Sequence, residues 1–256
     1  MDKKFITYEQ PLNERIRLFL RLEYLFQQVD WSLQGESQWH NRTTLSALVD
    51  ILEILARADV KTELLKYLEK LTANLSRLHN NSAVDKQQLA QILAQLEESQ
   101  QNLFGTSGQV GQALRDHHMI SSILQRKTVS AGTSHVDLPL YHAWLQRPAD
   151  ERSHTLQSWF DELAIVRKPI KLTLELIRTS IEAQACKAEQ GFYQSALDPN
   201  RAIQMIRVFV AADVPCYAEI SGGKHRVSVR FMVEHGAERP TQTDTDIEFH
   251  MSCCAL

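Results

Sequence analysis

The chain has 256 residues, of which 28 are Lys or Arg and 31 are Asp or Glu, giving a formal net charge of −3 at pH 7. A chain of this length can bury a substantial core, in one large domain or in two small ones. The slight acidic excess argues against a protein that holds nucleic acid through a global positive charge, so any cationic binding site must be local.

The sequence predicts neither a membrane span nor a disulfide framework. No stretch of about 18 apolar residues is free of charges, and residues 1–8 lack the apolar core of a signal peptide. The four cysteines show no CxxC spacing: Cys186, Cys216, Cys253 and Cys254. We therefore expect a soluble, unexported chain with reduced thiols, as in the cytoplasm, and no membrane insertion.

The N-terminal part is predicted to form one strand and then helices. Residues 4–9 alternate like a short strand, which we expect to join the sheet formed by the C-terminal part of the chain. Asn13 is predicted to cap a helix over residues 14–29. The next helix is predicted to begin at Asn41 or Thr43.

Leucines at heptad spacing follow. Asp59 is predicted to cap a helix whose leucines step by four and three residues: Leu64, Leu68, Leu71, Leu75 and Leu78. Beyond a turn at residues 80–85, a second helix continues the rhythm with Leu89, Ile92, Leu96 and Leu103. The pair predicts a long antiparallel helical hairpin. Such a seam is typical of an intramolecular core, and dimerisation through it is the alternative.

Further helices are predicted up to residue 185. One runs over residues 109–125, with His117 and His118 in its middle. Another begins at Pro139, and two more cover residues 150–163 and 165–185.

From Gly191 onward the pattern changes to strands. These are predicted at residues 204–210, 217–220, 226–233 and 246–251, with a polar loop at 236–243. The sequence thus predicts an α+β protein with segregated parts. We expect a mainly helical domain at residues 13–188 and a smaller antiparallel β-sheet domain built from residues 1–12 and 189–256.

The segment 218–232 predicts a basic β-hairpin with a Gly222-Gly223 turn. Side chains alternate along a strand, so Val227, Val229 and Phe231 share one face, while the other carries Lys224, Arg226, Ser228 and Arg230. A cationic face suits a carboxylate-bearing peptide, a phosphate or a nucleic-acid backbone. A solvated face with cross-strand ion pairs is the alternative interpretation.

No motif indicates catalysis. The sequence has no GxGxxG, P-loop, HExxH or GxSxG signature, which favours a binding protein over an enzyme, without cofactor or metal. Two other hypotheses stay open. One is an enzyme that uses its histidines with a metal: His117, His118, His135 or His142. The other is a nucleic-acid-binding adaptor that uses the basic hairpin.

Several blocks of the sequence, in the same order and over essentially the full length, resemble the ZapD family of bacterial cell-division proteins. These blocks are residues 8–17 (YEQPLNERIR), 20–25 (LRLEYL), 60–65 (VKTELL), 136–145 (VDLPLYHAWL), 191–194 (GFYQ), 220–232 (ISGGKHRVSVRFM) and 249–254. The resemblance implies a cytoplasmic, non-enzymatic homodimer that acts at the mid-cell division site. It also implies that a basic groove binds the C-terminal tail of the tubulin-like protein FtsZ, and that the dimer bundles FtsZ filaments into the Z-ring.

The resemblance also implies site residues. Five match positions that the family uses for tail binding or its support: Arg21, Arg57, His142, Arg226 and Arg230. His118 departs from the family pattern, which often has Arg there, so this contact is expected to be weaker or dependent on pH. Lys224 and Arg115 are additional basic candidates. We expect Arg226 and Arg230, with Arg21 nearby, to form the groove.

Overall fold

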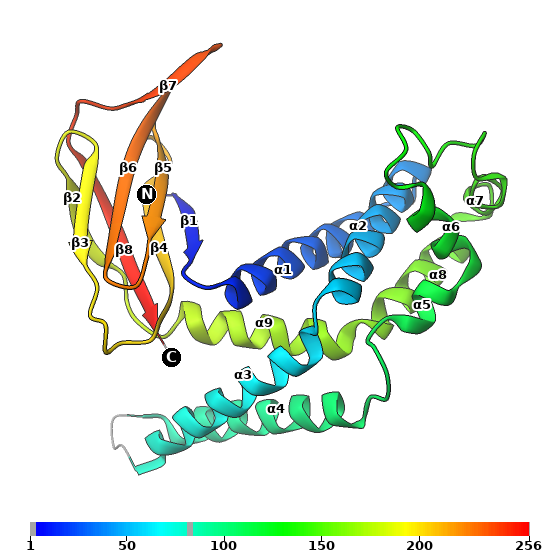
Figure 1. Ribbon diagram of the computed structural model, residues 1–256, viewed down its shortest axis with the longest axis horizontal. Coiled ribbons are helices and arrows are strands. Elements are labelled where there is room, and N and C mark those ends of the chain that lie inside the picture. Colours follow the sequence, from blue (N-terminus) through cyan, green and yellow to red (C-terminus); the bar gives the residue numbers. More distant parts are fainter. Residues whose placement is uncertain (1–3, 81–83, 256) are drawn as a thin grey trace. The chain divides into compact units, whose positions relative to one another are not determined.

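The computed structural model describes residues 4–80 and 84–255. The chain forms two units, one made of Met1–Leu18 with Leu174–Leu256 and the other of Phe19–Thr173. Strands make up most of the first unit and helices the second (Figure 1), so the predicted α+β class is confirmed. We call the first the β unit and the second the helical unit. The boundaries between them fall inside α1 (Glu14–Ser32) and α9 (Ala164–Arg178).

The β unit contains two antiparallel sheets. The first has the strand order β1 (Phe5–Pro11), β4 (Ile203–Ala211), β8 (Ile247–Ala255) and β2 (Gln184–Ala188). The second has the order β3 (Phe192–Ala196), β6 (Arg226–His235) and β5 (Tyr217–Gly222), and β7 (Glu238–Gln242) also pairs with β6. The expected pairing of the N-terminal strand is confirmed, because β1 pairs with β4 from Phe5 opposite Ala211 to Pro11 opposite Met205.

The two sheets enclose one hydrophobic core. Val227, Val229 and Phe231 of β6 are fully buried, as their alternation predicts. Phe231 meets Phe249 of β8 with ring centroids 5.1 Å apart, so side chains of both sheets interdigitate. This burial fixes which face of β6 is turned outward.

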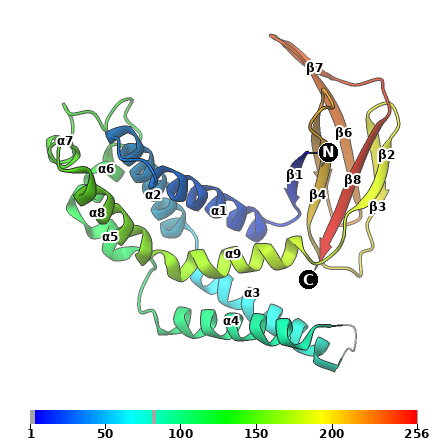
Figure 2. The same ribbon diagram turned by 180° about the vertical axis from the view of Figure 1, so that it is seen from behind.

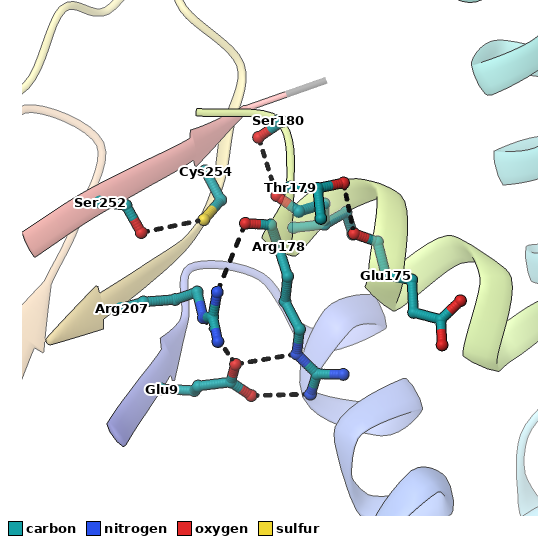
Figure 3. Close-up of polar contacts among 9 residues, drawn as sticks. Glu9, Glu175, Arg178, Thr179, Ser180, Arg207, Ser252 and Cys254 are labelled. Carbon is teal, nitrogen blue, oxygen red and sulfur yellow. Dashed lines mark hydrogen bonds and ion pairs between the residues drawn. The ribbon is translucent and has the colours of Figure 1, made fainter. Parts of the chain in front are cut away.

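A carboxylate ties β1 to two arginines of the β unit. Glu9 on β1 accepts hydrogen bonds from Arg178 and from Arg207 on β4 (Figure 3). All three side chains are about four-fifths buried. The cluster therefore holds the edge strand β1 through its side chain as well as through its backbone.

The helices follow the chain as α1 (Glu14–Ser32), α2 (Gln38–Arg57), α3 (Val60–Ser76), a 3-10 turn (Arg77–Asn80), α4 (Lys86–Gly105), α5 (Gln112–Asp116), α6 (His118–Arg126), α7 (Pro139–Leu145), α8 (Ala149–Glu162) and α9 (Ala164–Arg178). Two predicted caps are confirmed: Asn13 accepts from the backbone N–H of Ile16, and Asp59 from that of Thr62. The predicted start of α2 was wrong, because Ser37 caps it instead.

α3 and α4 lie side by side in both views (Figures 1 and 2), which confirms the helical hairpin. The buried seam consists of Leu64, Leu68, Leu71, Leu89, Leu96 and Leu103. Leu78 departs from the prediction, because it lies in the 3-10 turn with 37% of its surface exposed. Part of the predicted connecting turn, residues 81–83, lies outside the described residues. No helix in the described segments is long and apolar enough to cross a membrane.

The predicted helix over residues 109–125 is in fact two helices. The chain breaks at His117, whose φ of −64° and ψ of 122° are extended and which precedes α6 as its N-cap residue. The buried residues explain the break. After Leu114, a continuous helix would turn His117 and His118 inward, whereas the buried residues are Met119, Ile120 and Ile123.

The prediction also missed three strands. The last helix ends at Arg178 rather than at residue 185, and Gln184–Ala188 forms β2, which pairs with β8. β3 was not predicted, and the expected loop at 236–243 contains β7. Each of these strands has only five residues, so the alternation of its side chains is a weak signal.

Candidate functional site

The outer face of the second sheet gathers polar side chains from three strands. The strand register places Phe192 of β3 and Glu219 of β5 on either side of Arg230. Gln194 of β3 lies directly opposite Ser228 of β6. Since Val227, Val229 and Phe231 point into the core, the outward residues of β6 must face away from it.

A groove of about 840 Å³ lies on this face. Its lining residues come from all three strands and the turn of the hairpin: Phe192, Gln194, Glu219, Ile220, Ser221, Gly222, Gly223, Arg226, Ser228 and Arg230. The structure therefore brings together two of the residues predicted from the sequence, Arg226 and Arg230. Lys224 is exposed in the adjoining turn and does not line the groove.

The two guanidinium groups of the groove are free of internal partners. Within residues 4–80 and 84–255, the side chain of neither Arg226 nor Arg230 makes a hydrogen bond or an ion pair. Glu219 stands directly opposite Arg230 in the strand register, yet its carboxylate forms no ion pair with it. The alternative of a face neutralised by cross-strand ion pairs is therefore not what the structure shows. The groove carries two cations against one anion.

Glycine at position 222 lets the hairpin end pack closely. A Cβ added there would lie 2.5 Å from Cδ2 of Leu12, which fills the space on the core side of the turn. Gly223 then donates its N–H to the carbonyl of Arg226 at 3.0 Å and closes the hairpin. These contacts fix the point from which Arg226 projects.

The other four predicted residues belong to the helical unit. Arg21 lies exposed on α1, and His118 is the exposed first residue of α6. Arg57, at the end of α2, forms an ion pair with Glu53 at 3.7 Å. His142 of α7 is exposed. In the described part of the chain, no hydrogen bond, ion pair or ring contact joins any two of these four residues. The expected proximity of Arg21 to the groove stays a prediction.

Arg115, the additional basic candidate, has a structural role. Its Nη1 donates to the carbonyl oxygens of Leu52 and Val110, and its Nη2 to the side chain of Gln112 at 2.9 Å. Burial lowers the pKa of this guanidinium. Arg115 therefore ties α5 to the C-terminal half of α2 rather than offering free donors to a ligand.

The histidines and cysteines form no evident chemical centre. The rings of His135 and His142 lie 5.5 Å apart, but no group of three or more metal-ligating side chains occurs in the described part of the chain. The four cysteines are free thiols, and burial raises the pKa of Cys216, Cys253 and Cys254. Raised pKa values keep these thiols protonated and unreactive near neutral pH.

The sequence prediction missed Phe192, Gln194 and Glu219 as groove residues. Glu219 lies in a predicted strand, but only the register with β6 sets it beside Arg230. Phe192 and Gln194 lie in the unpredicted β3. The signal available for β3 was the alternation of Phe192, Gln194 and Ala196 with Tyr193 and Ser195.

Comparison with known proteins places the whole arrangement in one family. The family model described as ZapD, a cell division protein, matches residues 20–230. The chain belongs to the ZapD family. A relative from Methylococcus capsulatus named "Cell division protein ZapD" is 40% identical over 254 residues, which cover 99% of this chain and 100% of that protein. Membership in the ZapD family gives the chain a role in cell division.

Proposed function

We propose that this ZapD-family chain binds the C-terminal tail of FtsZ in the groove of the β unit and, as a homodimer, cross-links FtsZ filaments. One observation carries the proposal. Arg226 and Arg230 line the same exposed groove, and neither has a partner among the described residues. The chain would act without catalysis, in the cytoplasm at the mid-cell division site.

The chemistry of the groove suits a peptide that bears carboxylates. A planar guanidinium can hold a carboxylate through two parallel hydrogen bonds. Phe192, with 39% of its surface exposed, offers apolar contact area beside Arg230. An exposed ion pair is worth under about 1 kcal/mol, so useful affinity requires several such contacts in one groove.

Dimerisation would turn weak tail binding into filament bundling. A filament displays many tails, so a dimer that engages two of them gains from effective concentration, by about a hundredfold or more where the geometry allows. We propose that the domain at residues 13–188 provides the dimer contact. Arg21, Arg57, His118 and His142 in that domain would contact or support the tail.

Glu219 favours a peptide over a nucleic acid as the ligand. Its carboxylate lines the same groove as the two arginines and would repel a continuous phosphate backbone. A peptide can instead direct a backbone N–H or a basic side chain towards it. The net charge of −3 leaves little positive charge elsewhere for a broad phosphate footprint.

The test is binding of a fluorescent FtsZ tail peptide to wild type and to Arg226→Glu at low and moderate salt. Arg239→Glu is the matched control, because Arg239 is also exposed in the β unit but does not line the groove. We expect saturable binding that Arg226→Glu abolishes and Arg239→Glu retains. Intact affinity in folded Arg226→Glu would refute the groove as the tail receptor. Preferential binding of single-stranded DNA would support the nucleic-acid alternative.

A further inference from the structure

Ser228 lies at the centre of a cluster of hydrogen-bond donors on the outer face of the second sheet. Along β6 it is flanked by Arg226 and Arg230, which lie two residues away on either side and share its face. Across the sheet, the register sets Gln194 of β3 and Ser221 of β5 directly opposite it. All five residues line the groove. Ser228 therefore has a donor-bearing neighbour on every side in the plane of the sheet.

The strand pairing brings these side chains within reach of one point. Gly223 donates to the carbonyl of Arg226, and hydrogen-bonded pairs alternate along the ladder from there, so Ser221 and Ser228 form the next such pair. The Cα atoms of such a pair lie about 5.5 Å apart. Along one strand, neighbours on the same face are about 7 Å apart, and a long arginine side chain can turn back over this distance. A small ligand above Ser228 can thus contact the whole cluster.

The donors of this cluster have no partners inside the protein. Over the described residues 4–80 and 84–255, the hydroxyls of Ser221 and Ser228 and the side-chain amide of Gln194 make no hydrogen bond, and the two guanidinium groups likewise make none. A guanidinium group only donates, an amide NH₂ group donates twice and a hydroxyl can donate once. The cluster therefore suits a ligand that is negatively charged and rich in acceptor oxygens.

We propose that the cluster around Ser228 binds a tetrahedral oxyanion, the phosphoryl group of inorganic phosphate or of a phosphomonoester. A phosphomonoester carries about −1.5 to −2 charges near neutral pH, which the charges of Arg226 and Arg230 can balance. A carboxylate has two oxygens in one plane, whereas a phosphoryl group offers three acceptor oxygens to donors that approach from several directions. The inference goes beyond the proposed function and does not rest on it, because phosphate is a different ligand from the tail.

Glu219 limits the site to a single phosphoryl group. Its carboxylate lines the groove opposite Arg230, one step along the sheet from the pair of Ser221 and Ser228. A continuous phosphate backbone along the arginines would have to pass this carboxylate, whereas one phosphoryl group above Ser228 would not. The two negative charges still repel each other, so Glu219 should weaken the binding of phosphate.

The test is an NMR titration of the isotope-labelled full chain with sodium phosphate at constant ionic strength. Amide shifts report weak binding and its location together. We expect saturable shifts at Gln194, Ser221 and Ser228, and much smaller shifts with sodium acetate at the same concentrations. No saturable shift at these amides up to about 20 mM phosphate, or equal affinity for acetate, would overturn the proposal.

Substitutions in the cluster should weaken phosphate binding. We expect Arg226→Ala to lower the affinity about tenfold and Ser228→Val about threefold, since the first removes a charged donor and the second a neutral one. Arg239→Ala and Thr7→Val are the matched controls, because they remove an exposed cation and an exposed strand hydroxyl that do not line the groove. Wild-type affinity in both cluster variants would refute the site.

Glu219→Gln should strengthen phosphate binding by about three- to fivefold, because it removes the negative charge that lines the groove. A gain in affinity cannot arise from a variant that fails to fold. Unchanged or weaker binding in this variant would contradict the placement of the oxyanion beside Glu219.

The same titration with adenosine monophosphate separates the two sources of the phosphoryl group. Phe192 is 39% exposed and lies opposite Arg230, where a base could stack on its ring. Tighter binding of adenosine monophosphate than of phosphate, reduced to the phosphate level by Phe192→Ala, would assign a nucleotide. Equal affinity would assign the phosphoryl group alone.

The outcomes are independent of the proposed function. Failure of phosphate to bind would leave the tail peptide titration unaffected, because that titration contains no phosphate. A tail peptide that does not bind would equally leave the phosphate site in place.

Discussion

Glu9 and Arg178 form a two-point ion pair in the β unit. Nε and Nη2 of Arg178 donate to Oε1 and Oε2 of Glu9 at 2.9 and 2.8 Å (Figure 3). Oε1 also accepts from Nε of Arg207 at 2.9 Å. One carboxylate near the N-terminus thus binds two guanidinium groups from the C-terminal part of the chain.

Replacing Glu9 with Gln should destabilise the β unit by about 2 kcal/mol, because two largely buried guanidinium groups would lose the carboxylate that they share. The measurement is the midpoint of urea unfolding. Glu14→Gln is the control, since the side chain of Glu14 is 87% exposed in its pair with Arg17 and should change stability by less than about 0.5 kcal/mol. Equal effects of the two substitutions would show that the Glu9 cluster adds nothing beyond a surface pair.

Acid should weaken the fold through the same residue. Burial raises the pKa of Glu9, but the hydrogen bonds and charges of Arg178 and Arg207 outweigh it and hold the pKa below its ordinary value of 4.5. A lowered folded-state pKa gives stability that is present above pH 4.5 and lost as the pH falls below it. Wild type should therefore lose more unfolding free energy than Glu9→Gln between neutral pH and pH values below 4.5. Parallel pH profiles for the two proteins would contradict this.

Gly222→Ala should cost about 1–2 kcal/mol, because the new methyl group would overlap Cδ2 of Leu12. Leu12→Ala removes the obstacle, so the double variant should be more stable than the sum of the single effects predicts. Thermal unfolding of the four proteins in this cycle gives the coupling. If the changes in unfolding free energy of the two single variants simply add, the side chain of Leu12 does not contact position 222. Gly223→Ala is a matched control, since no atom lies within 4 Å of its added Cβ.

Arg226→Lys tests whether the geometry of the guanidinium matters as well as its charge. Lysine keeps the positive charge but cannot make the two parallel hydrogen bonds of a planar fork. Tail peptide binding should weaken by about three- to tenfold, with the loss seen in anisotropy titrations at moderate salt. Arg239→Lys should bind as wild type does. Full affinity in Arg226→Lys would indicate that position 226 contributes only charge.

Local patterns in the sequence predicted those features of the fold that depend on residues close together in the chain. The leucine rhythm revealed the helical hairpin, and the alternation of Val227, Val229 and Phe231 showed which face of β6 is buried. Since that face was known, the outward direction of Arg226 and Arg230 followed without the structure.

Features that depend on distant residues escaped prediction. β2 is a strand because residues 184–188 pair with residues 247–251, and the pattern of its five residues does not predict this pairing. Glu219 becomes part of the groove only through the register of β5 with β6. The break at His117 depends on which residues the surrounding helices bury.

The pairing of β1 with β4 has a consequence for synthesis of the protein. Glu9 and Arg207 are 198 positions apart, and the whole helical unit is encoded between them. At translation rates of about 5–20 residues per second, β1 waits roughly 10–40 s before its partner strand is made. During that time the segment that will form β1 has no partner strand. It carries Phe5 and Ile6, which are 41% and 43% exposed even in the folded β unit. The nascent chain should therefore present its N-terminal segment to chaperones for longer than any other part of the sandwich.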